Sequence, residues 1–133
     1  MNNIYIARTA ESPEIDFDFT CHTLNMNGES YPENASEFFR PILITLETYL
    51  KSIANSDIIF NFQLTYFNSA STKMLYNIFE LLNESANSNN NRITLNWYHD
   101  EEDDTILEFG MDVQEDFQGL NVKPIILDIA KEA

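Results

Sequence analysis

Apolar and polar residues alternate along several stretches of the chain, a period of two that is typical of strands with one buried face. The alternation predicts two short strands within residues 14–27, joined through Cys21 and His22, and further strands at residues 58–67 and 92–98. Strands covered on both faces would be almost continuously apolar. The alternation therefore favours a mixed sheet with helices mainly on one face.

Three other stretches have the helical period of 3.6. The first stripe follows Asn34 and Glu37, which resemble a capping box, and the second follows the segment Asn68–Thr72. The apolar positions are Phe38, Phe39, Ile42, Leu43, Leu46, Tyr49, Leu50 and Ile53; then Met74, Leu75, Ile78, Phe79, Leu81 and Leu82; then Ile106, Gly110, Val113 and Phe117. The second helix is expected to end near the polar loop 87–92.

A weak strand at residues 3–7 and a last strand at residues 125–129 complete the pattern, and Pro124 favours an edge position for the last strand. The order is three strands, then helix, strand, helix, strand, helix and strand. At 133 residues the whole chain, 1–133, fits one α/β domain.

Two strand–helix–strand units in this order place three loops at one edge of the sheet. Crossovers of this kind are parallel and right-handed, so the helices begin at the same edge. The loops are GESYPEN (28–34), FNSAS (67–71) and HDEEDD (99–104). Binding sites of open α/β sheets usually lie at this carboxyl edge.

The charge of the chain narrows the choice of partner. Acidic residues number 22 against 7 basic ones, which gives a net charge of -15. Such a surface repels nucleic acids and anionic membranes, so the expected partner is a protein with a basic patch. A single cysteine allows no internal disulfide, and no leader or membrane-spanning run is found, so a soluble cytoplasmic protein is expected.

The start of the second helix carries the main candidate, Ser69. Asn68 or Ser69 can act as the N-cap, because either side chain can accept a hydrogen bond from the first turn. Ser69 can also accept a phosphoryl group, since a helix N-terminus favours negative charge and Lys73 lies one turn further on. The two interpretations are compatible.

Catalytic arrangements are poorly supported. A triad of Ser69, His99 and Asp100 lacks the Gly-x-Ser-x-Gly elbow and a glycine-lined oxyanion loop. Cys21 and His22 are neighbours on an extended segment and point to opposite faces, so a core cysteine and a turn histidine are expected instead.

Two further loops carry candidate residues. The acidic run 100–104 lacks the alternation and glycine of a calcium loop, so a solvated turn before a helix is expected and no metal site. Pro32 holds Tyr31 extended, and this tyrosine fits either core packing or contact with a partner.

The motif GESYPEN closely resembles the signature of the SiaC family of bacterial regulatory phosphoproteins. Ser12 and Pro13 before it, Tyr66, Asn68 and Lys73 after it, and the late strand ending at Trp97 and Tyr98 support the resemblance. It covers about residues 4–116. The resemblance implies a fold similar to STAS domains and a switch protein with neither catalytic activity nor a cofactor.

The resemblance also implies partners and site residues. A cognate kinase would phosphorylate Ser69, with Ser71 and Thr72 as alternatives, and a PP2C-type phosphatase would reverse it. The unphosphorylated form would bind and activate a diguanylate cyclase, which controls cyclic di-GMP and biofilm formation. The implied partner-binding residues are Tyr31, Glu33, Asn34, Asn68 and Lys73.

Two other functions remain open at this point. An anti-sigma factor antagonist would share the fold and the acceptor but switch an anti-sigma kinase. A small-molecule binding module would need an apolar pocket, for which this edge offers Tyr31, Tyr66 and Phe67.

Overall fold

The computed structural model describes residues 2–127, which form six strands and three helices. In chain order these are β1 (Ile4–Ile6), β2 (Glu14–Asp18), β3 (Thr23–Ser30), α1 (Ala35–Lys51), β4 (Asp57–Phe67), α2 (Ser69–Ser88), β5 (Arg92–Asp100), α3 (Asp104–Asp116) and β6 (Leu120–Leu127).

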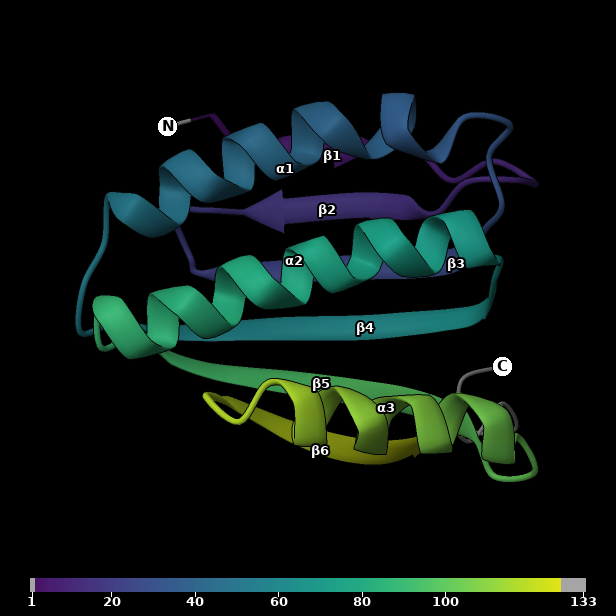
Figure 1. Cartoon of the computed structure of the whole chain (residues 1–133). Helices are drawn as coiled ribbons and strands as arrows, with labels where there is room; N and C mark the ends of the chain where they lie inside the picture. Colours follow the sequence, from purple (N-terminus) through teal and green to yellow (C-terminus); the bar gives the residue numbers. More distant parts are fainter. Residues whose placement is uncertain (1, 128–133) are drawn as a thin grey trace.

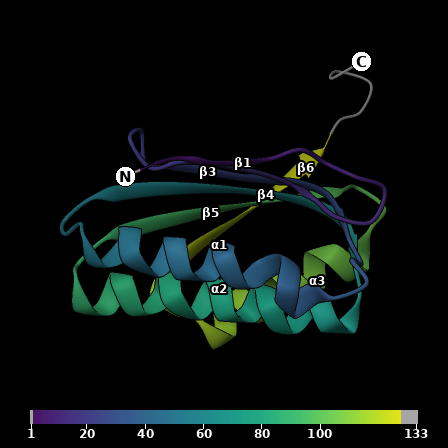
Figure 2. The same cartoon turned by 90° about the horizontal axis from the view of Figure 1, so that it is seen from above.

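The strands lie side by side in the order of the sequence, from β1 to β6 (Figure 1). β1, β2 and β3 pair antiparallel, whereas β3, β4, β5 and β6 pair parallel. All three helices cover one face of the sheet (Figure 2). The predicted mixed sheet with helices on one face is therefore confirmed, and so is the predicted order of the elements.

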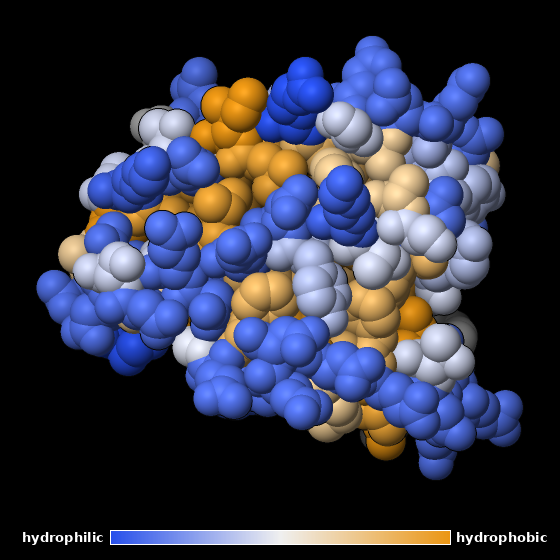
Figure 3. Space-filling view, in the orientation of Figure 1, coloured by the Kyte–Doolittle hydropathy of each residue, from blue (hydrophilic) through white to orange (hydrophobic). Residues whose placement is uncertain are grey.

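The core fills the space between the sheet and the helices. Phe62 of β4 and Trp97 of β5 are fully buried, and their rings stack with centroids 4.3 Å apart. From the helices, Phe39, Leu46, Ile78 and Phe79 pack into the same core. Seen from the helical face, the outer surface carries many hydrophilic side chains with hydrophobic areas between them (Figure 3).

The opposite face of the sheet is polar. A row of amides crosses its central strands: Asn61 donates to Asn25 over 2.8 Å, and Asn96 donates to Asn61 over 2.9 Å. These residues occupy the positions that alternate with the buried ones, which is why the strands show a period of two.

The turn between β2 and β3 differs from the prediction. β2 ends at Asp18, whose carboxylate accepts the amides of Thr20 and Cys21 at 3.0 Å. This turn leaves Cys21 exposed, so the expected core cysteine is wrong. His22 lies in the turn as predicted, with a positive φ of 56°.

Two element bounds also differ. β6 begins at Leu120, five residues before the predicted start, and it is an edge strand as Pro124 indicated. Residues 128 and 129 of the predicted strand lie outside the described residues. α2 continues to Ser88, so the asparagine-rich loop is shorter than predicted.

Candidate functional site

The three helices begin at the carboxyl edge of the parallel strands, and each begins with a side-chain cap. Asn34 accepts the amide of Glu37 at 3.0 Å, Asn68 that of Ser71 at 2.9 Å, and Asp103 that of Ile106 at 3.0 Å. The caps fix where each of the three loops ends. Asn68, and not Ser69, is thus the cap of α2.

Ser69 is the first residue of α2, and its side chain is exposed. Because Asn68 makes the cap, the Ser69 hydroxyl is not needed to hold the helix. Within residues 2–127 no protein group hydrogen-bonds to this hydroxyl. Lys73, one turn further along α2, is also exposed.

The other two hydroxyls of this turn belong to the folded structure. Ser71 is fully buried, and its Oγ lies 2.8 Å from Oγ of Ser30. Thr72 is partly buried and donates its hydroxyl to the carbonyl of Asn68 over 3.0 Å. Of the three candidates, Ser69 is the most accessible to another protein.

The motif GESYPEN spans the end of β3 and the loop that follows, because residues 28–30 still belong to the strand. Gly28 has φ of 122°, which favours glycine, and a bulge separates it from Glu29. The carbonyl of Ser30 accepts the amide of Asn68 over 3.1 Å. The motif therefore positions the start of α2.

Tyr31 and Tyr66 form an exposed aromatic pair beside this junction. Their ring centroids lie 5.9 Å apart in an edge-to-face arrangement, and the two residues are 37% and 51% exposed. Tyr31 is thus a surface residue and not part of the core. Tyr31, Glu33, Asn34, Tyr66, Asn68, Ser69 and Lys73 are referred to below as the acceptor edge.

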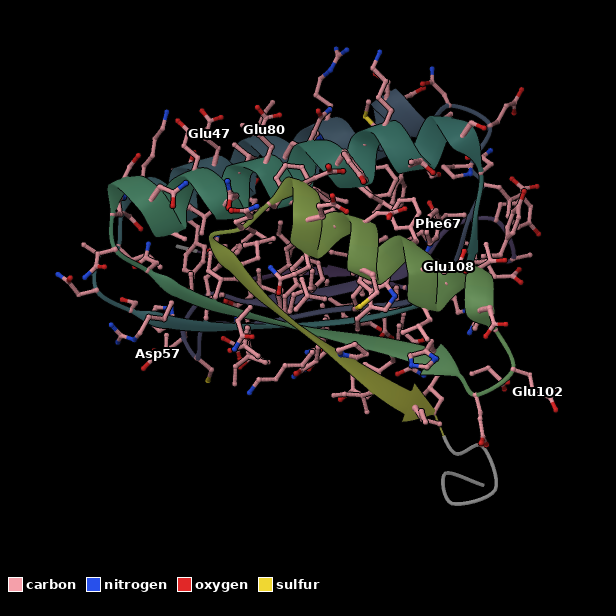
Figure 4. The ribbon with its side chains drawn as sticks, turned by 60° about the horizontal axis from the view of Figure 1, so that its bottom comes forward. Glu47, Asp57, Phe67, Glu80, Glu102 and Glu108 are labelled. Atoms are coloured by element: carbon pink, nitrogen blue, oxygen red, sulfur yellow. The ribbon has the colours of Figure 1, made fainter. Side chains whose placement is uncertain are left out.

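The loop at residues 99–104 meets the loop at residues 67–71 across a recess of about 340 Å³ between β4, α2 and α3. Its lining includes Tyr66, Phe67, Asp103 and Phe109, and the rings of Phe67 and Phe109 lie 4.8 Å apart. Figure 4 shows Phe67, Glu102 and Glu108 toward one end of the sheet, and Asp57 toward the other. The predicted meeting of three loops is therefore observed.

A fourth segment, residues 8–13, reaches the same edge and was not predicted to do so. The carbonyl of Glu11 accepts the amide of Tyr31 over 2.7 Å, and the hydroxyls of Thr9 and Ser12 lie 2.6 Å apart. Arg8 lies close to Gly28, 2.9 Å from where a Cβ atom would be. No periodicity marks this irregular segment, and only the resemblance at Ser12 and Pro13 pointed to it.

The residues of the hypothetical hydrolase triad are engaged elsewhere. His99 is nearly buried, and its Nδ1 lies 2.9 Å from the carbonyl oxygen of Asp100. The Asp100 carboxylate accepts the amide of Glu102 at 2.9 Å. Among the described residues no hydrogen bond joins Ser69, His99 and Asp100, so the structure contains no assembled triad.

Other kinds of site find no support in residues 2–127. No group of three or more histidine, cysteine or acidic side chains there is arranged to hold a metal ion. No helix in this part of the chain has the length and apolar character to cross a membrane. Of the acids at residues 100–104, Asp100 ends β5, Glu101 and Glu102 form a turn, and Asp103 and Asp104 begin α3.

The chain is similar to known proteins along most of its length. An uncharacterised protein of Pseudomonas aeruginosa strain UCBPP-PA14 is 29% identical over 116 residues, which cover 87% of this chain and 90% of that protein. The crystal structure of apo-SiaC from Pseudomonas aeruginosa has a TM-score of 0.83 at 27% identity, with 93% of this chain and 98% of that chain covered.

A second solved structure shows a relative with its partner. It is the diguanylate cyclase SiaD in complex with its activator SiaC from Pseudomonas aeruginosa, which matches with a TM-score of 0.83 at 26% identity and covers 91% of this chain and 97% of that chain. The family model described as "SiaC family regulatory phosphoprotein" matches residues 6–127. This chain therefore belongs to the SiaC family of regulatory phosphoproteins.

Proposed function

We propose that this chain is a non-catalytic switch protein of the cytoplasm that a cognate kinase phosphorylates on Ser69. A PP2C-type phosphatase removes the phosphate, and the unphosphorylated form binds and activates a diguanylate cyclase. The observation that carries this proposal is the position of Ser69, exposed at the first residue of α2 beside an independent cap. The activator role of a related SiaC toward a diguanylate cyclase supports the choice of effector.

The site can accept a phosphate without refolding. The Ser69 side chain is exposed, so its modification breaks no contact of the core. Free amides and the dipole at the start of α2 stabilise negative charge, and Lys73 lies one turn away. Asn68 keeps its hydrogen bond to Ser71 in either state, so the helix keeps its cap.

The same phosphate changes the surface that a partner meets. It adds about -1.5 to -2 charges at pH 7 next to Tyr31 and Tyr66. Glu33 is exposed on the same edge, so the added charge is only partly balanced by Lys73. A partner that covers the aromatic pair would have to desolvate the phosphate, which costs binding free energy. Phosphorylation therefore releases the effector.

The acceptor is tested by incubating the purified chain with its cognate kinase and ATP and mapping the modified residue by mass spectrometry. Wild type and Ser36→Ala are expected to gain one phosphate, whereas Ser69→Ala gains none. Ser36 is a suitable control because it lies at the start of α1, as Ser69 does in α2. Phosphate on Ser69→Ala in the wild-type amount would contradict the assignment.

The switch is tested by measuring binding to the diguanylate cyclase and the rate of cyclic di-GMP formation. Ser69→Ala is expected to bind and activate as wild type does. Ser69→Asp should bind at least about tenfold more weakly, which corresponds to about 1.4 kcal/mol. Equal binding and activation by the two variants would rule out an electrostatic switch at Ser69.

A further inference from the structure

A groove runs between α1 and α2 on the outer surface of the helical layer. It comprises two neighbouring recesses of about 200 and 440 Å³ that share Glu47, Leu81 and Glu84. Leu43, Leu50 and Leu81 contribute apolar surface to the groove, and Ile44, which is 61% exposed, contributes more. Figure 3 shows hydrophobic surface between hydrophilic side chains on this side of the molecule.

Acidic side chains line the groove. Glu47 of α1 and Glu80 and Glu84 of α2 are all exposed, and Glu47 and Glu80 project outward from the helical layer in Figure 4. Glu80 and Glu84 lie one turn apart on α2, where like charges repel each other. Lys51 pairs with Glu47 at 3.1 Å. In the described part of the chain, no lysine, arginine or histidine forms a salt bridge with Glu80 or Glu84.

The groove is separate from the acceptor edge. At 1.5 Å per residue, Asn77 at its near end lies about 12 Å along α2 from Ser69, and Glu84 lies about 22 Å away. None of the residues that line either recess belongs to the acceptor edge. Charge added at Ser69 is largely screened over such distances at physiological ionic strength.

We propose that this groove binds a basic amphipathic helix of a protein partner, in both phosphorylation states of Ser69. The outer surface of two packed helices accepts a third helix, whose apolar side chains fill the groove. Lysine or arginine residues flanking the apolar side chains of that helix pair with Glu80 and Glu84. A second copy of this chain is a poor occupant, because each copy has a net charge of -15.

This contact goes beyond the proposed switch. One surface responds to phosphate, whereas the other holds a partner continuously, so the chain can stay attached to one protein while it releases another. The partner presents a helix that is apolar on one side and basic along the flanks.

The probe is an 18-residue helical peptide with leucine on one face and lysine on the flanks, labelled for fluorescence anisotropy at 150 mM salt. A peptide of the same composition in scrambled order is the control probe. The ordered peptide is expected to bind at least about tenfold more tightly, because only it presents an apolar face. Equal binding of both peptides would overturn the proposal, since charge alone would then explain it.

Two matched pairs of variants locate the site. Glu80→Gln with Glu84→Gln should weaken binding about tenfold, whereas Glu108→Gln with Asp112→Asn on α3 changes it less than about twofold. Each of these double variants removes two acids one turn apart on an exposed helical surface. Ile44→Ser should weaken binding, whereas Ile59→Ser on the opposite face of the sheet should not. If the two double variants weakened peptide binding equally, or if Ile44→Ser and Ile59→Ser did, the assignment to the groove would be overturned.

The two proposals fail independently. Ser69→Asp is expected to bind the ordered peptide as wild type does, even if it no longer binds the cyclase. A loss of peptide binding in Ser69→Asp would overturn the independence of the groove. Loss of cyclase binding alone would leave the groove proposal standing.

Discussion

The hydroxyl oxygens of Ser30 and Ser71 lie 2.8 Å apart, and both side chains are completely buried. This hydrogen bond joins the last residue of β3 to the first turn of α2, two residues after Ser69. It ties the end of β3, within the GESYPEN motif, to the first turn of α2, while the Ser69 hydroxyl stays exposed. The buried pair thus holds in place the surface on which the proposed switch acts.

Replacing Ser71 by alanine should destabilise the fold by about 1–3 kcal/mol, because the Ser30 hydroxyl then loses its buried partner. Urea denaturation of wild type and variant measures the change. The double variant Ser30→Ala with Ser71→Ala should recover part of the loss, since no unpaired hydroxyl is left. Additive losses in the double variant would contradict a direct interaction between the two side chains.

The cap of α2 gives a second prediction. Asn68→Ala should lower the free energy of unfolding by about 1 kcal/mol, because the amide of Ser71 loses its acceptor. Asn68→Asp keeps an acceptor and should unfold near the wild-type urea concentration. Asn34→Ala, at the equivalent cap of α1, is the matched control for the size of the effect.

The same Asn68 variants separate stability from binding. Asn68→Asp places a charge beside Ser69, so it should bind the diguanylate cyclase more weakly than wild type although it is equally stable. Wild-type affinity in Asn68→Asp would show that charge at this edge does not control binding.

The contact between α3 and the sheet gives a third prediction. A Cβ atom at Gly110 would lie 2.7 Å from Cδ1 and Nε1 of Trp97, which is closer than packed atoms approach. Nε1 of Trp97 also donates to the carbonyl of Ile106 over 2.7 Å. Gly110→Ala should therefore destabilise by about 1–3 kcal/mol through overpacking, although alanine favours helix by about 1 kcal/mol.

Thermal unfolding measures this loss, and fluorescence of Trp97, the one tryptophan of the chain, reports whether its surroundings change. Met111→Ala is the control, because Met111 is the next residue of α3 and is 42% exposed. A variant Gly110→Ala that is more stable than wild type would show that α3 can move away from the sheet without cost.

The sequence predicted the sheet because each strand buries only one face. Phe60, Phe62 and Leu64 alternate with Ile59, Asn61 and Gln63, and this alternation follows directly from the geometry of a strand. The sites of helix initiation were also predictable, since the caps at Asn34 and Asn68 are local interactions between neighbours in the sequence.

Other features depend on contacts between distant residues, which periodicity does not contain. The bond between Ser30 and Ser71 joins residues 41 apart, and the segment at Glu11 reaches Tyr31 only through the pairing of β2 with β3. Cys21 continued an apolar alternation, but Asp18 ended the strand first by accepting two amides of the turn. These two local hydrogen bonds therefore end the strand although the apolar alternation continues.

The last prediction concerns alkaline pH. Burial, with a smaller effect from the nearby charge of Asp18, raises the pKa of Tyr49 to about 12. The folded chain therefore keeps this proton at pH values where the unfolded chain, with an ordinary tyrosine pKa of about 10, has lost it. The contribution of the protonated Tyr49 to the free energy of unfolding is fully present below about pH 10 and is lost as the pH rises from about 10 to about 12.

Urea denaturation at intervals between pH 9 and pH 12 measures this loss. The rise of the Tyr49 pKa from about 10 to about 12 corresponds to at most about 2–3 kcal/mol. The Tyr49 side chain is almost completely buried, so solvent screens this effect little. Tyr49→Phe has no proton to lose, so its stability should fall less steeply over the same range. Parallel curves for wild type and Tyr49→Phe would show that the Tyr49 hydroxyl loses its proton at the same pH in the folded and the unfolded chain, which would contradict its burial.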